Sequence, residues 1–182
     1  TLNRNRFRDL EHRRNAGEMN KNVINDIRKL KTRVDVVLLM PHWGYEFVHH
    51  PPIGVILEAK SFIDAGVALI IGNHPHVIQG FEKYGGGWIY YSLGNFLFDL
   101  RAERTKISSI LSCTIKGKND IECNVKYLKV NSKFQPTLIK PSEESKIKAF
   151  IGDENQKIRS GLCKQELDDD KVYKEFEKQY NK

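Results

Sequence analysis

The sequence has no long hydrophobic run, and no stretch reaches the roughly 18 apolar residues that a membrane-spanning helix needs. The polar opening, residues 1–14, also lacks the apolar segment of a secretory signal peptide. As written, the chain is therefore expected to be soluble. Because it begins without methionine and in a charged stretch, we expect it to be part of a larger protein, with any anchor outside these 182 residues.

Cysteine is scarce, and its three copies show no metal-binding or redox spacing. The odd number, without CxxC or Cys/His ligand patterns, argues against both a disulfide framework and a zinc ribbon. Cys113 and Cys123 could face each other across a hairpin. We nevertheless expect buried free thiols, because a disulfide requires a geometry that the sequence does not contain.

Low-complexity segments and internal repeats are also absent from the sequence. A length of 182 residues, with 40% hydrophobic and 29% charged residues, is typical of one soluble globular domain. The net charge of +7 would suit an anionic partner such as a phosphate ester, a polyanionic polymer or nucleic acid. The basic residues are spread along the chain without interleaved aromatics, so we expect a solvated basic surface and no nucleic-acid partner.

The first half of the chain has the pattern of alternating helices and strands. Apolar residues at helical spacing predict an amphipathic helix over 18–32. Residues 34–40 form a short apolar run, typical of a strand covered on both faces. A helix is predicted over 53–65, ended by Gly66, and residues 67–71 form a second buried strand. The order strand, helix, strand predicts a βαβ unit.

The second half has the pattern of hairpins followed by helices. The glycine-rich turn at 85–87 predicts a hairpin over 77–91. Alternating apolar and polar residues predict a second antiparallel hairpin over 108–130, which we interpret as scaffold. Beyond it the pattern weakens, and helices are predicted over 142–151 and 168–180.

Three of the six histidines follow the two predicted parallel strands. His42 lies in the loop after the first strand, and His74 and His76 lie in the loop after the second. Because ligand sites in such sheets lie beyond the carboxyl ends of the strands, these loops should meet. Neutral imidazole binds Zn, Mn or Fe well, and Pro75 stiffens the His-x-His loop. We predict a metal site here and interpret residues 49–50 as exposed or substrate-side groups.

Other polar residues in these loops are further candidates. Glu46 could take a proton as a catalytic residue, bind a metal through water or form a salt bridge. The candidates for substrate binding are Asn95, Trp43 and Arg101. Trp43 would form a pocket wall or pack in the core, and Gly94 would allow close backbone approach beside Asn95. Arg101 is the type of group that grips phosphate, although it could equally be a surface residue.

Four motifs follow one another in the first half of the chain: a strand ending in His42-Trp43-Gly44-x-Glu46, then Asp64-Ala65-Gly66, then Gly72-Asn73-His74-Pro75-His76, and finally Tyr91-Ser92-Leu93-Gly94-Asn95-Phe96. Taken together in sequence order, they are more specific than any one of them alone. In this order they resemble the CapA, or poly-γ-glutamate capsule-synthesis, family over about residues 20–100.

The resemblance implies a fold and a set of ligands. The CapA family is similar to the calcineurin-like metallophosphoesterases, which hold two metal ions, here Mn, Fe or Zn, between two mixed sheets and flanking helices. By this resemblance, His42 would bind one metal, and His74 and His76 would be the closing histidine pair. The expected fold class is α/β (α+β mixed), a partial metallophosphoesterase-like sandwich with a βαβ unit followed by antiparallel hairpins.

The resemblance also divides the chain. Residues 1–135, with a core at 18–100, would be the C-terminal half of the domain, and residues 136–182 a charged helical tail. The family's other ligand motifs precede the His-Trp-Gly loop, where this chain has only 41 residues and none of those motifs. Three histidines cannot bridge two metals without carboxylates. The missing N-terminal half is therefore an expected partner, alongside other capsule-synthesis proteins.

The function implied by the resemblance is metal-dependent, phosphoesterase-like hydrolysis in the biosynthesis of a bacterial capsule. The substrate would be an anionic polymer, such as poly-γ-glutamate, or a phosphate ester. The alternative is a non-catalytic polymer-binding or assembly factor that keeps the fold without turnover. The resemblance further implies a membrane-associated, extracytoplasmic place for the full-length protein.

Overall fold

The computed structural model describes residues 22–117 and 120–162. It opens with a helix over residues 22–31, which confirms the described part of the predicted amphipathic helix. The predicted start of that helix at 18–21 and the predicted helix over 168–180 lie outside the described residues.

A four-stranded sheet in the order β1-β2-β4-β3 forms the centre of the fold. The strands β1 (Leu38–Leu39), β2 (Leu69–Ile71) and β4 (Gly87–Tyr90) are parallel, and β3 (Phe81–Tyr84) pairs antiparallel with β4. The helix α2 (Ile53–Ala65) joins β1 to β2, which confirms the βαβ unit. The carboxyl ends of β1 and β2 therefore lie side by side.

The helix α2 has the predicted bounds because its two ends are marked in the sequence. Pro52 precedes its first residue, and Gly66 follows its last with φ 120°, a value that side chains other than hydrogen disfavour. The Gly66 N–H donates to the carbonyls of Phe62 and Ile63 and so ends the helix. The buried residues of α2 are Ile56, Ala59, Phe62, Ile63 and Ala65.

The prediction that the first strand is covered on both faces is wrong. β1 is only two residues long; Val37 before it is buried, whereas Leu38 is 48% exposed and Met40 is 70% exposed. β1 is the last strand at one side of the sheet and pairs with β2 alone among the described residues. The continuous apolar run does not reveal this position, because an edge strand and an interior strand can share the same composition.

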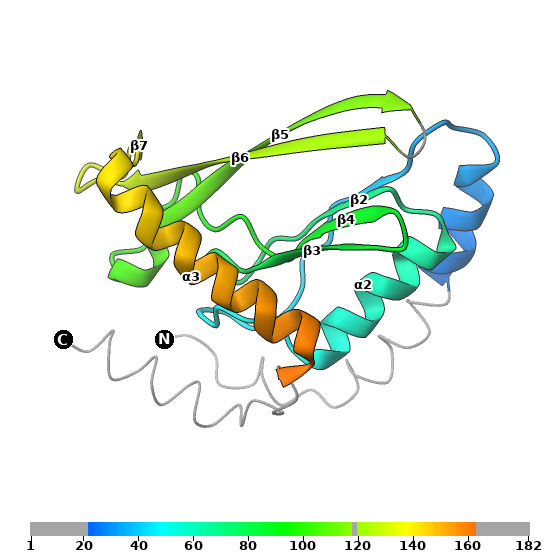
Figure 1. Ribbon diagram of the computed structural model, residues 1–182, viewed down its shortest axis with the longest axis horizontal. Helices are drawn as coiled ribbons and strands as arrows, with labels where there is room; N and C mark the ends of the chain where they lie inside the picture. The colour runs from blue at the N-terminus through cyan, green and yellow to red at the C-terminus, as the bar shows by residue number, and fades with distance from the viewer. Residues whose placement is uncertain (1–21, 118–119, 163–182) are drawn as a thin grey trace.

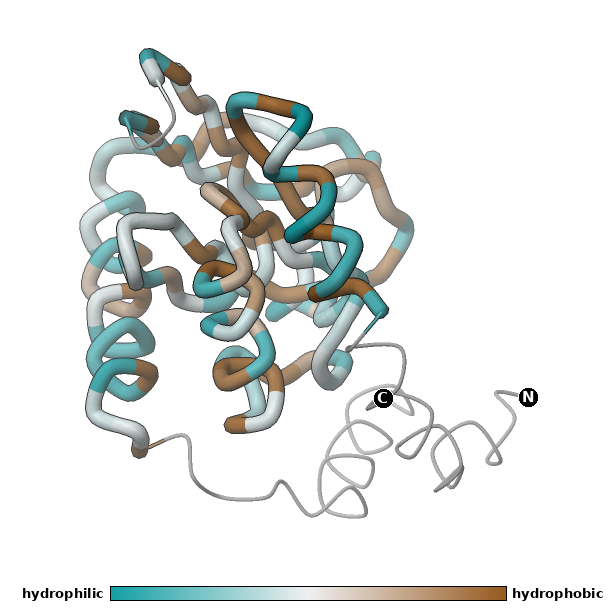
Figure 2. Tube along the Cα trace, turned by 90° about the vertical axis from the view of Figure 1, so that its right-hand side faces the viewer, coloured by the Kyte–Doolittle hydropathy of each residue, from teal (hydrophilic) through white to brown (hydrophobic). Residues whose placement is uncertain are grey.

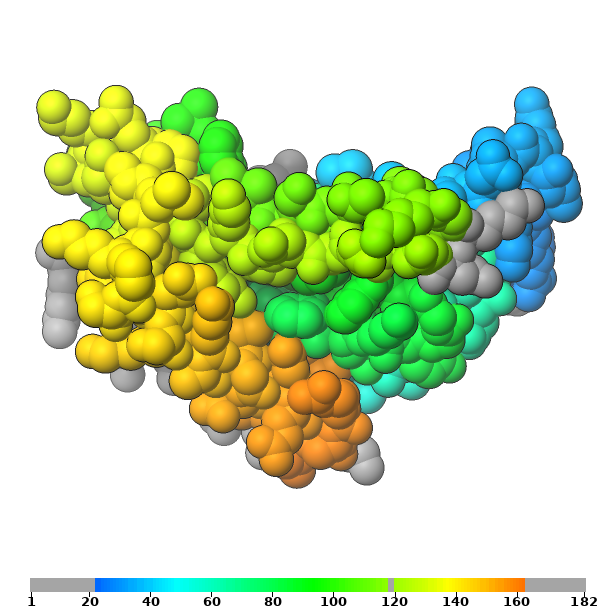
Figure 3. All heavy atoms as spheres, turned by 45° about the horizontal axis from the view of Figure 1, so that its top comes forward, coloured from blue at the N-terminus to red at the C-terminus, as the bar shows by residue number. Residues whose placement is uncertain are grey.

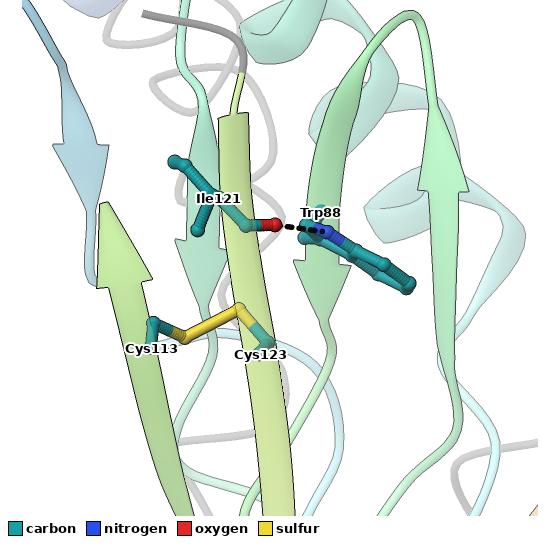
Figure 4. The surroundings of a disulfide bond; sticks show 4 residues. All are labelled: Trp88, Cys113, Ile121 and Cys123. Atoms are coloured by element: carbon teal, nitrogen blue, oxygen red, sulfur yellow. Dashed lines mark hydrogen bonds between the residues drawn. A yellow bond between two sulfur atoms is a disulfide. The ribbon is translucent and has the colours of Figure 1, made fainter. Parts of the chain in front are cut away.

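A long hairpin lies over the sheet, on the side away from α2 in the view of Figure 1. Its strands β5 (Ile107–Gly117) and β6 (Asp120–Val130) pair antiparallel, as predicted, and β7 (Pro136–Leu138) adds a third strand. Figure 3 shows the hairpin running across this face, from the first turns of the helix α3 (Pro141–Ser160) toward the helix over residues 22–31. The Trp88 indole N–H donates to the Ile121 carbonyl at 3.1 Å and so ties the hairpin to the sheet (Figure 4).

The expectation of free thiols is wrong for two of the cysteines. Cys113 and Cys123 are directly opposite in the β5–β6 register and form a disulfide (Figure 4). The register of the two strands places these cysteines opposite each other, and this register is the geometry that the sequence alone does not contain. Cys163 lies outside the described residues.

The helix α3 (Pro141–Ser160) is longer than the predicted 142–151. Pro141 begins it and Gly161, with φ 69°, ends it. The part after residue 151 escapes prediction because two of its three buried residues, Glu154 and Asn155, are polar, and only Ile158 is apolar. Asn155 accepts the Phe81 N–H at 2.6 Å, so this polar face is bonded to the edge strand β3.

The hydrophobic core has two parts. The larger part packs the helix over 22–31 and α2 against the sheet, and the smaller packs α3 against β5, β6 and the loop before β3. Among the described residues, no helix combines the length and apolar character required to span a membrane. Figure 2 shows hydrophilic and hydrophobic residues mixed along the helices.

Candidate metal centre

Backbone hydrogen bonds join the two histidine loops beyond the ends of β1 and β2. Asn73 donates its N–H to the Pro41 carbonyl at 3.0 Å, and Trp43 donates its N–H to the Asn73 carbonyl at 3.1 Å. This parallel pairing places His42 beside His74, with ring centroids 4.4 Å apart. The sequence argument that the two loops converge is thereby supported by their geometry.

The His-Pro-His loop has an unusual backbone. His74 has φ 102° and His76 has φ 60°, and the neighbouring Phe47 has φ 65°. Positive φ values are rare for residues other than glycine and tend to cluster at functional sites, where surrounding contacts hold them. One such contact is the Phe47 N–H, which donates to the Pro75 carbonyl at 2.7 Å. The strain is thus concentrated at the residues predicted to bind metal.

Three half-buried side chains present a compact set of donor atoms. One ligand atom each from Glu46, His74 and His76 lies within 4.8 Å of the others. His42 contacts His74 but does not belong to this group, and its side chain is exposed. Two imidazole nitrogens and one carboxylate oxygen suit Zn, Mn or Fe. The donor set therefore fits a divalent metal, with Glu46 completing the group instead of His42.

The hydrogen bond from His76 to Asn95 determines which nitrogen of His76 is left with a lone pair. The Asn95 Nδ2 lies 3.5 Å from the Thr105 carbonyl, to which it donates, so its Oδ1 faces His76 Nδ1 at 2.8 Å. An amide oxygen only accepts, so His76 Nδ1 carries the proton and Nε2 keeps a free lone pair. Metal-binding histidines are commonly oriented in this way. Asn95 is only 8% exposed, which points to a positioning residue more than to one that touches substrate.

The pKa of His74 is lowered to about 4, chiefly by burial and further by the neighbouring His42 and His76. The imidazole is therefore neutral at pH 7, and its lone pair is available to a cation. Burial among other histidines thus favours the protonation state that metal binding requires.

Trp43 lies in the core, away from the surface of the centre. It is 8% exposed, its indole N–H donates to the Tyr91 carbonyl at 3.0 Å, and its ring stacks on that of Tyr91. A Cβ at Gly72 would overlap both Trp43 Nε1 and the Tyr91 carbonyl. Of the two roles considered for Trp43, the structure therefore supports packing and corrects the prediction of substrate binding.

The sequence indicates Arg101 as a candidate for substrate binding, but it does not single out Arg104, which lies three residues later. Arg101 is exposed on the segment between Asn95 and the 3₁₀ helix η2 (Glu103–Thr105). Arg104, within η2, is half-buried and donates from Nη1 to the Phe47 carbonyl at 3.4 Å. Nothing in the local sequence distinguishes these two arginines, because the hydrogen bond depends on a loop 57 residues earlier.

The prediction that residues 49–50 are exposed or substrate-side groups is wrong for His49. Its Nδ1 donates to the Ile78 carbonyl at 3.0 Å, and its ring packs edge-on against Phe150 of α3. Burial lowers the pKa of His49 and also that of the half-buried His50. His49 therefore helps to hold α3 on the fold.

The fold is of the α/β class and is consistent with part of a metallophosphoesterase-like domain, with the candidate metal ligands at the carboxyl ends of adjacent parallel strands. Residues 2–100 match the family model described as bacterial capsule synthesis protein PGA_cap. The chain belongs to this family.

Curated relatives agree with this assignment. The chain is 44% identical over 81 residues to the capsule biosynthesis protein CapA of Bacillus anthracis. The matched segment covers 44% of this chain and 20% of that protein. It is 39% identical over 90 residues to the PGA biosynthesis protein CapA of Bacillus subtilis, covering 50% of this chain and 24% of that protein. The matched part thus spans about a fifth to a quarter of the length of these relatives.

Proposed function

We propose that the full-length protein acts in the biosynthesis of a bacterial capsule, made of poly-γ-glutamate or a related polyanion, as a metal-dependent, phosphoesterase-like hydrolase. The observation that carries the proposal is the group of Glu46, His74 and His76, whose ligand atoms lie within 4.8 Å of one another. Its place beyond two parallel strands, in a chain of the PGA_cap family, supports the same reading.

The residues of the centre have separate tasks in this proposal. His74, His76 and Glu46 would hold a divalent cation, Mn, Fe or Zn, with His42 alongside His74. When bound, such a cation would polarise a phosphoryl or carbonyl oxygen and activate water. Asn95 keeps the proton of His76 on Nδ1 and so leaves Nε2 to face the cation. Glu46 is half-buried and serves as a ligand here, in place of the catalytic proton acceptor considered from the sequence.

A second metal would need ligands from outside the described residues. Within residues 22–117 and 120–162, the only group of three ligand atoms contains a single carboxylate, which suffices for one cation. The relatives are four to five times longer than the matched segment. We propose that a segment equivalent to their unmatched part completes a two-metal site, as the missing N-terminal half, and that other capsule-synthesis proteins bind the assembled domain.

The single carboxylate also favours a second candidate function. A centre that holds one cation without a bridging carboxylate could bind an anionic polymer or organise an assembly without turnover. In this reading, the protein is a non-catalytic polymer-binding or assembly factor of the capsule machinery.

Metal analysis combined with a turnover assay distinguishes the two candidates. The full-length protein, loaded with Mn, Fe or Zn, is given an activated phosphodiester, and metal content and hydrolysis are measured. Two metals per chain and hydrolysis that is lost on His74→Ala support the hydrolase. Metal binding without hydrolysis supports the binding factor.

A histidine outside the centre provides the control. His50→Ala should keep both metal content and turnover, because His50 lies beside Glu154 of α3 and is not part of the donor group. Full-length protein that binds no divalent metal under these conditions would remove both the hydrolase and the metal centre.

A further inference from the structure

Arg104 lies close to the candidate metal centre, separated from it by one aromatic ring. Its guanidinium carbon is 5.6 Å from the centroid of the Phe47 ring, and that ring is stacked on His76 with centroids 5.8 Å apart. The neighbouring Thr105 accepts a hydrogen bond from Asn95, which also bonds to His76. η2 is thus tied to the same histidine from two directions.

One edge of the Arg104 guanidinium has no acceptor. Nη1 donates to the Phe47 carbonyl, whereas Nε and Nη2 are buried and have no hydrogen-bond partner within the described part of the chain. The N–H groups of Nε and Nη2 point in the same direction and form the fork that grips a carboxylate or phosphate with two parallel hydrogen bonds. A buried cationic donor without an acceptor costs free energy, which an oxyanion at this edge would recover.

Two acidic side chains that could neutralise Arg104 already have cationic partners. Glu103, next in the chain, pairs with Lys106, and Glu154 of α3 pairs with Lys157 at 2.6 Å. Glu154 still has one buried carboxylate oxygen, Oε2, without a hydrogen-bond partner. Both Glu154 and Arg104 act electrostatically on His49. An ion pair between Glu154 and Arg104 within the protein is therefore the alternative to a bound substrate anion.

We propose that Arg104 binds an oxyanion of the substrate, a carboxylate or a phosphate, through Nε and Nη2. The anionic group would then be held beside the metal centre, with Phe47 between the guanidinium and His76. The inference rests on the proposed function and narrows its substrate to molecules with an anionic group near the reacting bond. Arg104 is thus a substrate-binding residue at this site.

The test measures anion binding without metal, so that a bound cation does not contribute. The chain is treated with a chelator and titrated calorimetrically with inorganic phosphate and, separately, with a γ-linked glutamate oligomer. Arg104→Gln should weaken binding at least about tenfold, and Arg104→Lys should lose most of it, because an ammonium group cannot present the planar fork. Arg159→Gln is the control, since Arg159 is exposed near the end of α3 and should leave binding unchanged.

The two probes identify the source of the oxyanion. Binding of phosphate alone assigns a phosphate ester, binding of the oligomer alone assigns a carboxylate polymer, and loss of either with Arg104→Gln supports the proposal. Binding by Arg104→Gln that equals the wild type would overturn it, as would a wild-type chain that binds neither probe. In the latter case, equal losses of melting temperature in Arg104→Gln and Glu154→Gln would identify the internal pair.

A measurement on the unaltered chain covers the case in which Arg104→Gln does not fold. The Nε–H resonance of Arg104 should shift on addition of phosphate, and a resonance that does not move would overturn the proposal. Failure of the proposed function gives a different result from failure of this inference. If the wild-type protein binds no metal but Arg104→Gln still weakens anion binding, the anion site exists without the metal centre.

Discussion

At the scale of single residues, hydrogen bonds that no local pattern contains determine the roles at the centre. Asn95 and Arg104 are each hydrogen-bonded to a partner far along the chain, His76 in one case and Phe47 in the other. Glu46 joins the donor group because its loop is bonded to Pro75 through Phe47. Histidines are recognised in a sequence by their type, but the groups that orient them are recognised only once the fold is known.

Asn95 provides a test of positioning at this scale. Asn95→Leu removes the acceptor from His76 Nδ1 and should lower affinity for Zn by about 10- to 100-fold, a loss typical of residues that orient a metal ligand. Asn95→Asp keeps an acceptor at this position and should retain more of the affinity. Both are measured by competition with a fluorescent chelator. A folded Asn95→Leu variant with wild-type affinity would disprove the positioning role.

Two glycines form a matched pair for a test of packing. An alanine Cβ at Gly72 would overlap the Tyr91 carbonyl and Trp43 Nε1, so Gly72→Ala should lower the free energy of unfolding by about 1–3 kcal/mol or more. Gly54→Ala, in α2, meets nothing within 4 Å and should raise it by up to about 1 kcal/mol. Urea denaturation measures both. Equal effects would show that the contact between Gly72 and Trp43 is not tight.

At the scale of elements, helices with clear end signals were predictable and polar interfaces were not. α2 has its predicted bounds because Pro52 and Gly66 mark them. α3 extends past the predicted end because the polar Glu154 and Asn155 interrupt the apolar pattern of its buried face between Ile151 and Ile158, and a helix is predicted from that pattern. The topology of the site follows from the βαβ unit alone, since parallel strands bring their carboxyl ends together.

The attachment of α3 predicts a pH dependence. Burial lowers the pKa of His49, with Arg104 and His50 lowering it further and Glu154 opposing them. The unfolded chain then takes up a proton as pH falls below 6.5, while folded His49 stays neutral to a lower pH. The free energy of unfolding should therefore decrease as pH falls through 6.5, and show no contribution from His49 above that range.

The variant His49→Asn isolates this contribution, because an amide N–H can replace the donor to the Ile78 carbonyl without titrating near neutral pH. Unfolding by urea is measured at pH 5 and pH 8 in metal-free wild type and variant. The difference between the two pH values should be smaller in the variant. An equal difference in both proteins would assign the pH dependence to other groups, such as His74, whose pKa is also lowered.

At the scale of the whole molecule, the structure has the predicted α/β class, and the two histidine loops meet as predicted. What the sequence does not reveal is which surfaces are covered. Leu38 and Met40 are exposed although their run has the composition of an interior strand, and Trp43 is buried although it follows a predicted ligand. Exposure depends on which strands and helices pack against each face, so a single periodic pattern does not determine it.

The disulfide between β5 and β6 leads to a prediction about the surroundings of the molecule. Disulfides form and persist in oxidising compartments and are rare where thiols are kept reduced. The half-buried Cys113 and Cys123 would therefore remain paired outside the cytoplasm. Titration of the unfolded protein should reveal two more thiols after reduction than before it, and alkylation in producing cells should label neither cysteine unless a reductant is added.

The same bond should contribute to stability by restricting the unfolded chain. For a sequence separation of 10, loop-closure entropy corresponds to about 2–3 kcal/mol, so the double variant Cys113→Ser, Cys123→Ser should unfold at lower urea concentration. Asn124→Ser, at an exposed neighbouring position on β6, should change little. The hairpin is tied to the sheet by Trp88 as well, so the loss should leave the four-stranded sheet and its metal affinity intact. A simultaneous loss of metal affinity would instead mean that the hairpin and the centre unfold as one unit.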